Sequence, residues 1–504
     1  MVLEGERKRF TVTVKNTSTE TTVDFVHISF QDTATTAIQA ATSNKDLPAA
    51  ELHELEVQLA HHPSLRWCKD EAEESPSIKP GAEAQFTIEV IGRTRLTDAT
   101  IQIDYANLGK RRSEVEEHFF TRQVSAPISI TVNASVQLQR PDIVPLSGDI
   151  AWSSDASPGS RTQSDDEASQ IRSSGKADGH LRSFISQKQS DDSDEEYCML
   201  LLDLRNSWPN PLSISLQARK PVADGNYTND SWNEAHSVNE VIQPGHVSRV
   251  VMILPKVYLK APHAAVPSLN PANQRQFVVS TSKISPETER ASREAFWYRE
   301  ELLKIVRGTW TEDGNGRHGE LELRSIRFTP RMVEAIRLDD LAIKTTIASD
   351  YPAAGDGEIV RQVGRAKFEV PIDEFLTMKT FVRNRSPRPI SPILRLQPHV
   401  AGLPHNVALD LDKRFSWTGV LQRKLPVIQP GETVESELGI VALCGGTYEV
   451  GATVDEAEFI NISGGDDDEK RNDDQMLLQG GNVLGEPKLR TWYMTEPCTI
   501  VAKR

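Results

Sequence analysis

The chain has 504 residues, four cysteines and a formal net charge of −15 at pH 7. Its length predicts two to four domains. The absence of a run of about 18 apolar residues excludes a membrane-spanning helix, and the absence of a basic surplus excludes the electrostatic footprint of a nucleic-acid-binding protein. The N-terminus lacks the apolar core of a signal peptide and enters a strand pattern at once, so we expect a fragment of a longer protein.

The first predicted domain, residues 1–128, begins with a strand that ends at an asparagine turn. Phe10 and Val14 lie on one face of this strand because side chains alternate along it. Asn16 ends the strand, since its short side chain can bond the nearby backbone. Further on, Ile78-Lys79-Pro80-Gly81 predicts a type II turn, in which Pro sets φ and Gly accepts positive φ. Residues 47–62 favour a short helix or a long connection.

The second predicted domain, residues 129–328, repeats this pattern. Leu200 and Leu204 stand at the same offsets before Asn206, and Ile242-Gln243-Pro244-Gly245 follows at the matching place. Residues 153–196, near the start of this domain, do not follow the strand-and-turn pattern. They are rich in Ser, Asp, Glu, Gln and Gly and contain few apolar residues. Such a composition buries too little apolar surface to offset chain ordering and predicts disorder.

Ser190 and Ser193 lie within this insert, in the run SDDSDEE. Acidic residues after each serine are typical of a site for an acid-directed kinase, so both serines are candidate phosphorylation sites. The alternative is a solvated loop with no specific role.

A helix is predicted over residues 285–307. Ser285 is a good N-cap and Pro286 a good first residue, and Gly308 is expected to end the helix. The apolar stripe on this helix comprises Ala291, Ala295, Tyr298, Leu302 and Ile305. The aromatic run Phe296, Trp297 and Tyr298 exceeds what one stripe needs. These aromatic residues either pack in the core or contact a partner protein. After the helix, residues 320–328 predict another strand with alternating apolar residues.

The third predicted domain, residues 329–504, carries the pattern again. Met378 and Val382 precede Asn384, and Ile428-Gln429-Pro430-Gly431 follows. An acidic loop is expected at residues 464–474. Three copies of strand, asparagine turn, strand and Pro-Gly turn predict an all-β protein of tandem immunoglobulin-like β-sandwiches with one prominent helix.

The sequence contains no pattern typical of catalysis or of metal binding, so we expect no catalytic residue, cofactor or metal. His61 and His62 are adjacent on the expected helix and point apart, which favours a surface pair. The separate cysteines favour a reducing compartment over immunoglobulin-type disulfides. Six Asn-X-Ser/Thr sequons favour the opposite, an extracellular adhesion array, although strand-end turns explain them as well: Asn16, Asn133, Asn226, Asn229, Asn384 and Asn461.

The predicted helix and the residues after it resemble a known family. The resemblance lies in residues 295–303 (AFWYREELL), Trp310, residues 319–324 (GELELR) and residues 328–332 (FTPRM). The chain is similar there to the C-terminal half of the large subunit specific to the TRAPP II vesicle-tethering complex, called hypercellular protein A in moulds and the NIK- and IKK-beta-binding protein in animals. The resemblance extends over the chain outside its two acidic segments.

This resemblance implies a cytosolic scaffold at the trans-Golgi network and early endosomes. Its partners would be the other TRAPP II subunits and, indirectly, a Rab GTPase, and it would meet membranes only through the complex. Nucleotide exchange belongs to small core subunits in that family, so no catalytic residue is carried over. A carbohydrate-binding accessory domain is a further alternative that needs an exposed aromatic platform, which the sequence does not obviously form from its tryptophans at Trp152, Trp208, Trp232 and Trp417.

Overall fold

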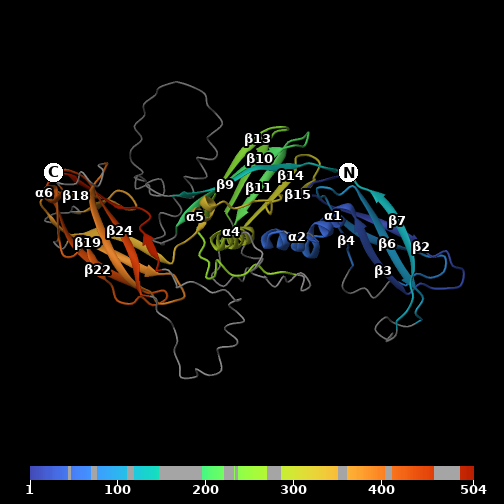
Figure 1. Ribbon diagram of the computed structural model, residues 1–504. Coiled ribbons are helices and arrows are strands. Elements are labelled where there is room, and N and C mark those ends of the chain that lie inside the picture. Colours follow the sequence, from blue (N-terminus) through green and yellow to red (C-terminus); the bar gives the residue numbers. More distant parts are fainter. Residues whose placement is uncertain are drawn as a thin grey trace, which may run out of the picture. The chain divides into compact units, whose positions relative to one another are not determined.

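The computed structural model contains three β-sandwiches, which confirms the predicted all-β class (Figure 1). Residues 1–144 and 198–336 form one compact unit with two sandwiches, and residues 145–197 and 337–504 form a second unit with the third sandwich. The structure describes residues 1–43, 47–69, 77–109, 118–146, 196–220, 232, 236–269, 285–349, 360–402, 411–458 and 489–503.

The first sandwich consists of two three-stranded sheets, β2-β5-β4 and β3-β6-β7, and a short parallel pair, β1-β8. Its strands are β1 (Val2–Leu3), β2 (Arg7–Lys15), β3 (Phe25–Asp32), β4 (Leu65–Trp67), β5 (Glu83–Ile91), β6 (Asp98–Ala106), β7 (Arg122–Ser129) and β8 (Val132–Asn133). Two helices, α1 (Thr33–Thr42) and α2 (Ala49–His61), connect β3 to β4. Asp32 caps α1 by accepting the N–H of Thr35 at 2.8 Å.

The second sandwich pairs a three-stranded sheet, β13-β10-β9, with a four-stranded sheet, β12-β11-β14-β15. Its strands are β9 (Val136–Leu146), β10 (Tyr197–Asn206), β11 (Leu212–Ala218), β12 (His236–Ile242), β13 (Val247–Pro255), β14 (Val306–Glu312) and β15 (His318–Glu320). The predicted helix is α4 (Pro286–Ile305), and α5 (Pro330–Ile336) adds Met332, Val333 and Ile336 to the core of this sandwich.

Helix α4 begins as predicted and ends differently. Ser285 accepts the N–H of Thr288 at 3.2 Å, and Pro286 is the first helical residue. Gly308 does not end the helix, because the chain passes from Ile305 directly into β14. A Cβ at Gly308 would lie 2.6 Å from the side chain of Leu321, so this glycine is required for close packing.

The prediction of a strand over residues 320–328 is wrong. Strand β15 ends at Glu320, and the chain then turns, with the N–H of Ile326 bonded to the carbonyl oxygen of Leu323 at 3.1 Å. Leu323 and Ile326 are both buried in the core of the second sandwich. A turn can bury residues three apart, and the alternating apolar pattern did not distinguish it from a strand.

The third sandwich pairs a four-stranded sheet, β16-β19-β23-β21, with a larger sheet of order β17-β18-β26-β24-β20-β22, in which β25 also pairs with β24. Its elements are β16 (Leu341–Ala348), β17 (Arg361–Gln362), β18 (Lys367–Pro371), β19 (Phe375–Asn384), β20 (Ser391–Val400), α6 (Leu411–Arg414), β21 (Phe415–Thr418), β22 (Gln422–Lys424), β23 (Thr433–Ala442), β24 (Gly446–Glu458), β25 (Thr491–Tyr493) and β26 (Cys498–Lys503).

Each sandwich is closed at one end by the asparagine of its repeated turn. In the second sandwich, Nδ2 of Asn206 donates to the carbonyl oxygens of Asn210 at 2.8 Å and Ile242 at 2.9 Å. Its Oδ1 accepts the N–H of Trp208 at 2.9 Å. Its own carbonyl oxygen accepts the N–H of Gly245 in the Pro-Gly turn, whose φ of 73° is the positive value predicted for it.

The same arrangement, which we call the asparagine clasp, recurs in the other two sandwiches. Asn16 bonds Thr21, Ile78 and Ser18, and Asn384 bonds Arg388, Ile428 and Ser386, through the equivalent atoms. All three clasp asparagines are buried. The repeat read from the sequence is therefore a repeat of hydrogen bonds that joins two distant turns in each sandwich.

The apolar positions before each clasp point inward, as predicted. Leu200, Leu204, Met378 and Val382 are almost fully buried. Their counterparts in the first sandwich, Phe10 and Val14, face the same way and contact the core, but they are only half-buried.

Candidate functional site: the joint between the first and second sandwiches

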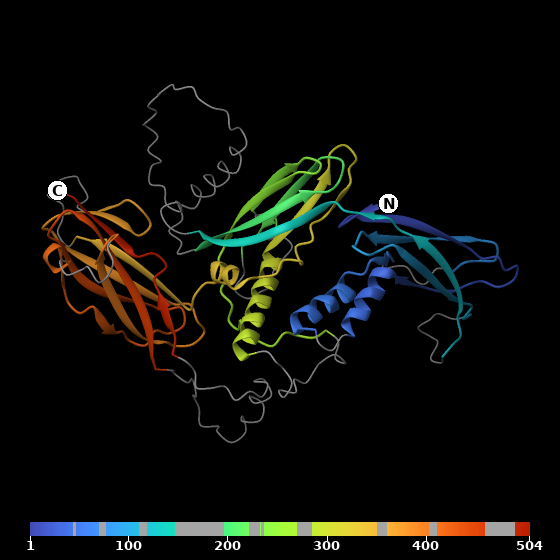
Figure 2. The same ribbon diagram turned by 45° about the horizontal axis from the view of Figure 1, so that its top comes forward.

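The first two sandwiches meet along α2 and α4, which lie side by side within one unit (Figure 2). Phe296 of α4 is 3% exposed and packs edge-on against the ring of His53 of α2, with 5.1 Å between ring centroids. Nδ1 of His53 lies 2.8 Å from the carbonyl oxygen of Pro267. An aromatic pair of this geometry adds to the burial of both rings.

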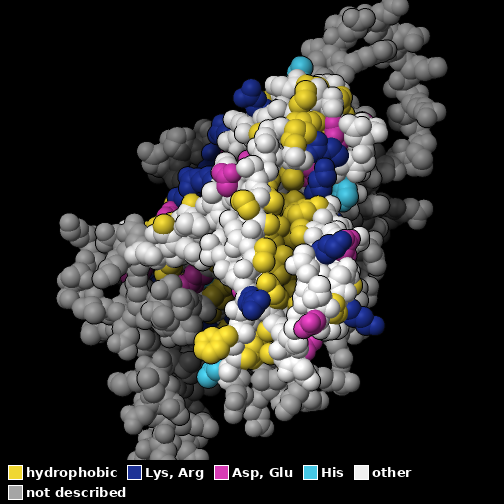
Figure 3. All heavy atoms as spheres, turned by 90° about the vertical axis from the view of Figure 1, so that its right-hand side faces the viewer, with side chains coloured by type: hydrophobic (Ala, Val, Ile, Leu, Met, Phe, Trp, Pro, Cys, Tyr) yellow, Lys and Arg dark blue, Asp and Glu magenta, His cyan; other side chains and the backbone are white. Residues whose placement is uncertain are grey.

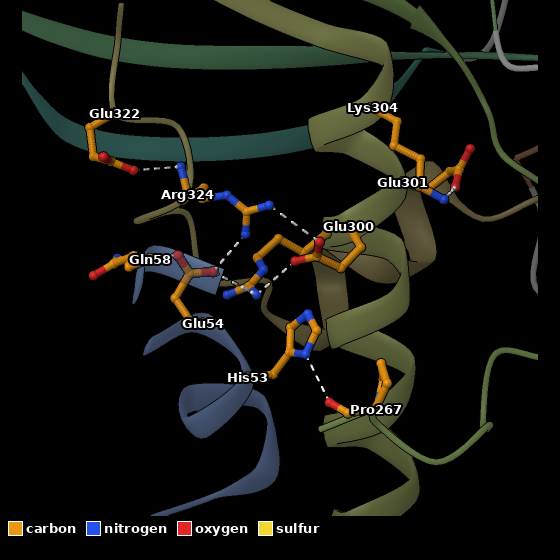
Figure 4. Close-up of polar contacts among 10 residues, drawn as sticks. His53, Glu54, Gln58, Pro267, Glu300, Glu301, Lys304, Glu322 and Arg324 are labelled. Carbon is orange, nitrogen blue, oxygen red and sulfur yellow. Dashed lines mark hydrogen bonds and ion pairs between the residues drawn. The ribbon is translucent and has the colours of Figure 1, made fainter. Parts of the chain in front are cut away.

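Four charged side chains lie beside this aromatic contact (Figure 4). We call them the joint cluster: Glu54, Arg299, Glu300 and Arg324. Oε2 of Glu54 on α2 accepts from Arg324 at 2.9 Å and from Arg299 at 3.3 Å. Arg299 also donates to Glu300 at 2.9 Å. The side chains of Glu54 and Arg299 are only 15% and 12% exposed, so water screens this pairing less than it would on the surface.

Helix α2 also binds a second segment, residues 267–269. The Glu56 carboxylate accepts hydrogen bonds from the N–H of Leu269 at 2.7 Å and from the hydroxyl of Ser268 at 3.1 Å. Glu56 is itself buried. Helix α2 is therefore held by hydrogen bonds to α4, to residues 267–269 and to Arg324.

A second contact joins the sandwiches where the backbones touch. Glu6 pairs with Gly319 in an isolated antiparallel bridge, and the N–H of Glu320 donates to the carbonyl oxygen of Gly5 at 3.1 Å. A Cβ at Gly5 would lie 2.1 Å from the carbonyl oxygen of Glu320, and one at Gly92 would lie 1.9 Å from that of Leu3. These positions require glycine because a backbone occupies the space of any side chain.

An arginine–carboxylate pair secures this second contact. Arg317 donates to Glu6 through two nitrogens, Nε at 2.9 Å and Nη2 at 2.6 Å. The N–H of Leu3 also donates to this carboxylate at 2.7 Å. Although burial alone would raise the pKa of Glu6, the hydrogen bonds and the charge of Arg317 lower it. The fork geometry fixes the orientation of β1 against the second sandwich.

Glu322 lies at the edge of the joint cluster, and its pKa is shifted in the opposite direction to that of Glu6. Partial desolvation of its carboxylate raises the pKa of Glu322, and the nearby carboxylate of Glu54 raises it further, while the N–H of Arg324 at 3.1 Å opposes both effects. The protonated form of Glu322 is therefore favoured in the folded chain. The stability that this gives is fully present below the pKa of Glu322 in the unfolded chain, and it is lost as the pH rises through the pKa of Glu322 in the folded chain. Glu322 is exposed to solvent, so water screens these effects and the shift contributes little to stability.

Of the three aromatic candidates of α4, Phe296 lies at this joint and Tyr298 lies in the core of the second sandwich. Phe296 and Tyr298 are buried, whereas Trp297 is partly exposed and donates its Nε1 hydrogen to the carbonyl oxygen of Ala264 at 3.0 Å. The burial of the first two favours the core-packing alternative for them. Contact of this run with a partner stays a prediction. Ser190 and Ser193, residues 464–474 and the acidic insert up to residue 195 lie outside the described residues.

Within the described part of the chain, no group of three or more His, Cys, Asp or Glu side chains could hold a metal ion, and no helix is long and apolar enough to cross a membrane. All four cysteines are free thiols, and burial raises the pKa of Cys198 and of Cys498 to about 12. Of the tryptophans, Trp208 donates to Glu312 at 2.8 Å and Trp417 packs against the core of the third sandwich.

We expect Glu54→Gln to destabilise the first unit by about 1–3 kcal/mol, because it removes the negative charge that pairs with two partly buried arginines, Arg299 and Arg324. Chemical denaturation followed by tryptophan fluorescence measures this loss. Glu83→Gln is the matched control: Glu83 pairs with Lys15 on the surface, with both side chains more than half exposed, and should change stability by less than about 1 kcal/mol. Equal effects of the two variants would contradict a structural role for the joint cluster.

Two of the sequon asparagines have no free amide hydrogen. Nδ2 of Asn16 and of Asn384 each donates to two carbonyl oxygens, and both side chains are buried. A glycan is attached at this nitrogen. Neither site therefore supports the extracellular alternative.

We accordingly expect the folded chain, produced in a glycosylating host, to carry no glycan at Asn16 or Asn384. Peptide mass spectrometry after release with a glycosidase reads each site separately. Asn133 is half-buried in β8, and Asn226, Asn229 and Asn461 lie outside the described residues. A glycan found at either clasp asparagine of a folded chain would contradict the clasp.

Comparison with known proteins assigns all three sandwiches to one family. Models of the second, third and fourth Ig-like domains of Trs120/TRAPPC9 match residues 1–133, 136–337 and 341–503 in that order. The chain belongs to the Trs120/TRAPPC9 family. This confirms the family predicted from the sequence.

Two curated relatives in yeasts match the same chain. The transport protein particle subunit trs120 of Schizosaccharomyces pombe is 21% identical over 350 residues, which are 69% of this chain and 23% of that protein. The trafficking protein particle complex II-specific subunit 120 of Saccharomyces cerevisiae is 22% identical over 370 residues, 71% of this chain and 25% of that protein. The chain thus matches about a quarter of the length of each relative.

Proposed function

We propose that this chain is a non-catalytic scaffold region of a TRAPP II complex, which holds other subunits in place during Golgi and endosomal vesicle transport. It acts from the cytoplasm at the periphery of the trans-Golgi network and early endosomes and meets membranes only through the complex. It supports the activation of a Rab GTPase that other subunits carry out, and it uses no cofactor.

The observation that carries this proposal is the match of three successive Ig-like domains to a family whose relatives are named as subunits of transport particles. The joint adds a physical reason. A scaffold needs domains whose relative orientation does not change when a partner binds, and the joint cluster with the contact at Gly5 supplies two separate restraints on the first two sandwiches.

Affinity capture tests the proposal. The tagged chain, incubated with a lysate that contains the other transport particle subunits, should recover several of them in fixed proportions, and cross-linking mass spectrometry should map their contacts onto the sandwiches. A chain shown to be folded by circular dichroism that recovers no subunit would contradict the scaffold role.

A further inference from the structure

Two surfaces of the first unit differ in what they show about a binding partner. Hydrophobic side chains form a stripe along the side of the first sandwich that Figure 3 shows. Partly buried side chains of this sandwich, such as Val12 and Ile128, pack against its own core. An apolar face of this kind does not specify what binds it. A site on α2 and α4 is more specific, because a segment of the chain already lies on it.

This segment is residues 263–269, which we call the strap. After β13 the chain runs past α4 to α2 in both views of the fold (Figure 1, Figure 2). Residues 264–268 have no regular secondary structure, and among the described residues no strap side chain belongs to a hydrophobic core. Ala264 and Pro267 are exposed, and Leu269 is 43% exposed. The strap is therefore not held by a hydrophobic core.

Helix α2 binds the strap through two buried polar side chains. His53 and Glu56 are about one turn apart, so they lie on the same face of α2, and they are only 8% and 5% exposed. Nδ1 of His53 lies 2.8 Å from the carbonyl oxygen of Pro267 (Figure 4). The Glu56 carboxylate accepts from the Ser268 hydroxyl and from the Leu269 N–H. Burial of such groups is unfavourable unless hydrogen bonds compensate, so this face of α2 depends on a bound main chain.

Helix α4 binds the other half of the strap. Nε1 of Trp297 donates to the carbonyl oxygen of Ala264 at 3.0 Å, and Nη1 of Arg293 donates to that of His263 at 3.4 Å. A main-chain carbonyl oxygen is supplied by any residue, so these contacts do not depend on the strap sequence. We call the four side chains that hold the strap the strap site: His53, Glu56, Arg293 and Trp297.

Glu56 restricts which segments fit the strap site. Its buried carboxylate takes one hydroxyl and one N–H donor from the strap. A serine or threonine followed by any residue except proline supplies both donors, because proline has no N–H. A carboxylate or phosphate in place of the Ser268 hydroxyl would be repelled by this buried charge. Carbonyl oxygens one and four residues before the hydroxyl then meet His53 and Trp297.

We propose that the strap site is a peptide-binding site, on which an extended segment of another protein, with serine or threonine at the position of Ser268, replaces the strap. A segment held by a few hydrogen bonds and by no core opens more easily than the strands of a sandwich. The strap then competes with the incoming segment and keeps its binding reversible. This inference rests on the proposed scaffold function in that it specifies how one partner is held, and it is tested without the complex.

Hydrogen exchange of the native chain tests the release of the strap. Leu202 is fully buried in β10, which lies between two other strands. The amide of Leu269 bonds Glu56 instead of a neighbouring strand, so it should exchange roughly a hundredfold faster or more than that of Leu202. Equal rates at the two amides would overturn the proposal, because the strap would then leave only when the unit unfolds.

Peptide binding tests the replacement. The probe is a fluorescent peptide of residues 260–269 with an amidated C-terminus. It is added to the native chain and to a strap variant of the full chain that carries Ser268→Ala and Leu269→Pro, which remove both donors to Glu56. Fluorescence anisotropy should show saturable binding to the strap variant, roughly tenfold or more tighter than to the native chain, because the weakened strap competes less.

Two matched pairs show whether Glu56 recognises the peptide. A probe that itself carries Ser268→Ala and Leu269→Pro should bind the strap variant roughly tenfold or more weakly, since it lacks both donors. Glu56→Gln in the strap variant should weaken binding of the original probe by a similar factor. Glu51→Gln, also on α2, should leave it unchanged, because Glu51 is 40% exposed and pairs with Arg327.

Equal binding of the two probes would overturn the proposal, and so would absence of saturable binding to a strap variant shown to be folded by circular dichroism. If the strap variant does not fold, the unlabelled peptide is added in excess to the native chain. It should speed hydrogen exchange at Leu269, because the displaced strap loses its bond to Glu56, and unchanged exchange would overturn the proposal. None of these results affects capture of other subunits by the chain, so failure of this inference and failure of the scaffold function are distinguishable.

Discussion

Replacing Asn206 with alanine is expected to lower the free energy of unfolding of the first unit by about 3–6 kcal/mol. The substitution leaves the carbonyl oxygens of Asn210 and Ile242 and the N–H of Trp208 without their partner, and each unsatisfied buried group costs about 1–3 kcal/mol. Urea denaturation monitored by circular dichroism measures the change.

Two further variants separate the causes. Asn206→Asp keeps the acceptor for Trp208 and loses both donors, so it should destabilise the unit nearly as much as alanine does. Asn239→Ala, at an exposed position of β12 in the same sandwich, should change stability by less than about 0.5 kcal/mol. If Asn206→Asp were as stable as the native chain, the two donated hydrogen bonds could not be what closes the sandwich.

The second large effect is expected for Gly5→Ala, which should separate the first sandwich from the second. Its Cβ would lie 2.1 Å from the carbonyl oxygen of Glu320, and its φ of 77° is unfavourable for any other residue. The contact must open, with a loss of about 3 kcal/mol or more. Calorimetry should then resolve two transitions in the first unit.

Gly81→Ala is the matched control for the backbone conformation. Gly81 has almost the same φ, 74°, but a Cβ there would meet no atom within 4 Å. It should cost only the roughly 1–2 kcal/mol of a left-handed backbone and leave the joint intact. Two transitions in both variants would show that backbone strain, and not the contact with Glu320, governs the joint.

Much of the repeat could be predicted from the sequence because its determinants are local. Asparagine turns, Pro-Gly turns and alternating apolar residues lie within a few positions of one another, and so do the cap and first turn of α4. The sequence did not predict the end of α4 because Gly308 serves packing against Leu321, which lies further along the chain, so the packing has no local signature.

The joint could not be predicted for the same reason. Glu54 and Arg299 are 245 residues apart, and Glu6 and Arg317 are 311 apart. In the sequence, Glu54 is one of several acids on a short helix with the composition of a solvated face. Only the folded chain brings these charges together, and no spacing rule connects them.

The partial exposure of Phe10 and Val14 illustrates a related limit. The sequence shows that Phe10 and Val14 occupy the positions of Met378 and Val382, but it does not show whether a neighbouring strand covers them. Strand pairing over long separations depends on the whole sheet, so the difference between half-buried and fully buried copies emerges only in the structure.

A distance measurement across the joint tests the central claim, that the first two sandwiches form one rigid unit. Spin labels at Lys15→Cys and Asn239→Cys, in a chain whose accessible Cys68 and Cys444 are replaced by serine, report the separation by pulsed electron paramagnetic resonance. The account predicts a single narrow distance distribution that Gly5→Ala broadens. A distribution already broad in the parent chain would contradict it.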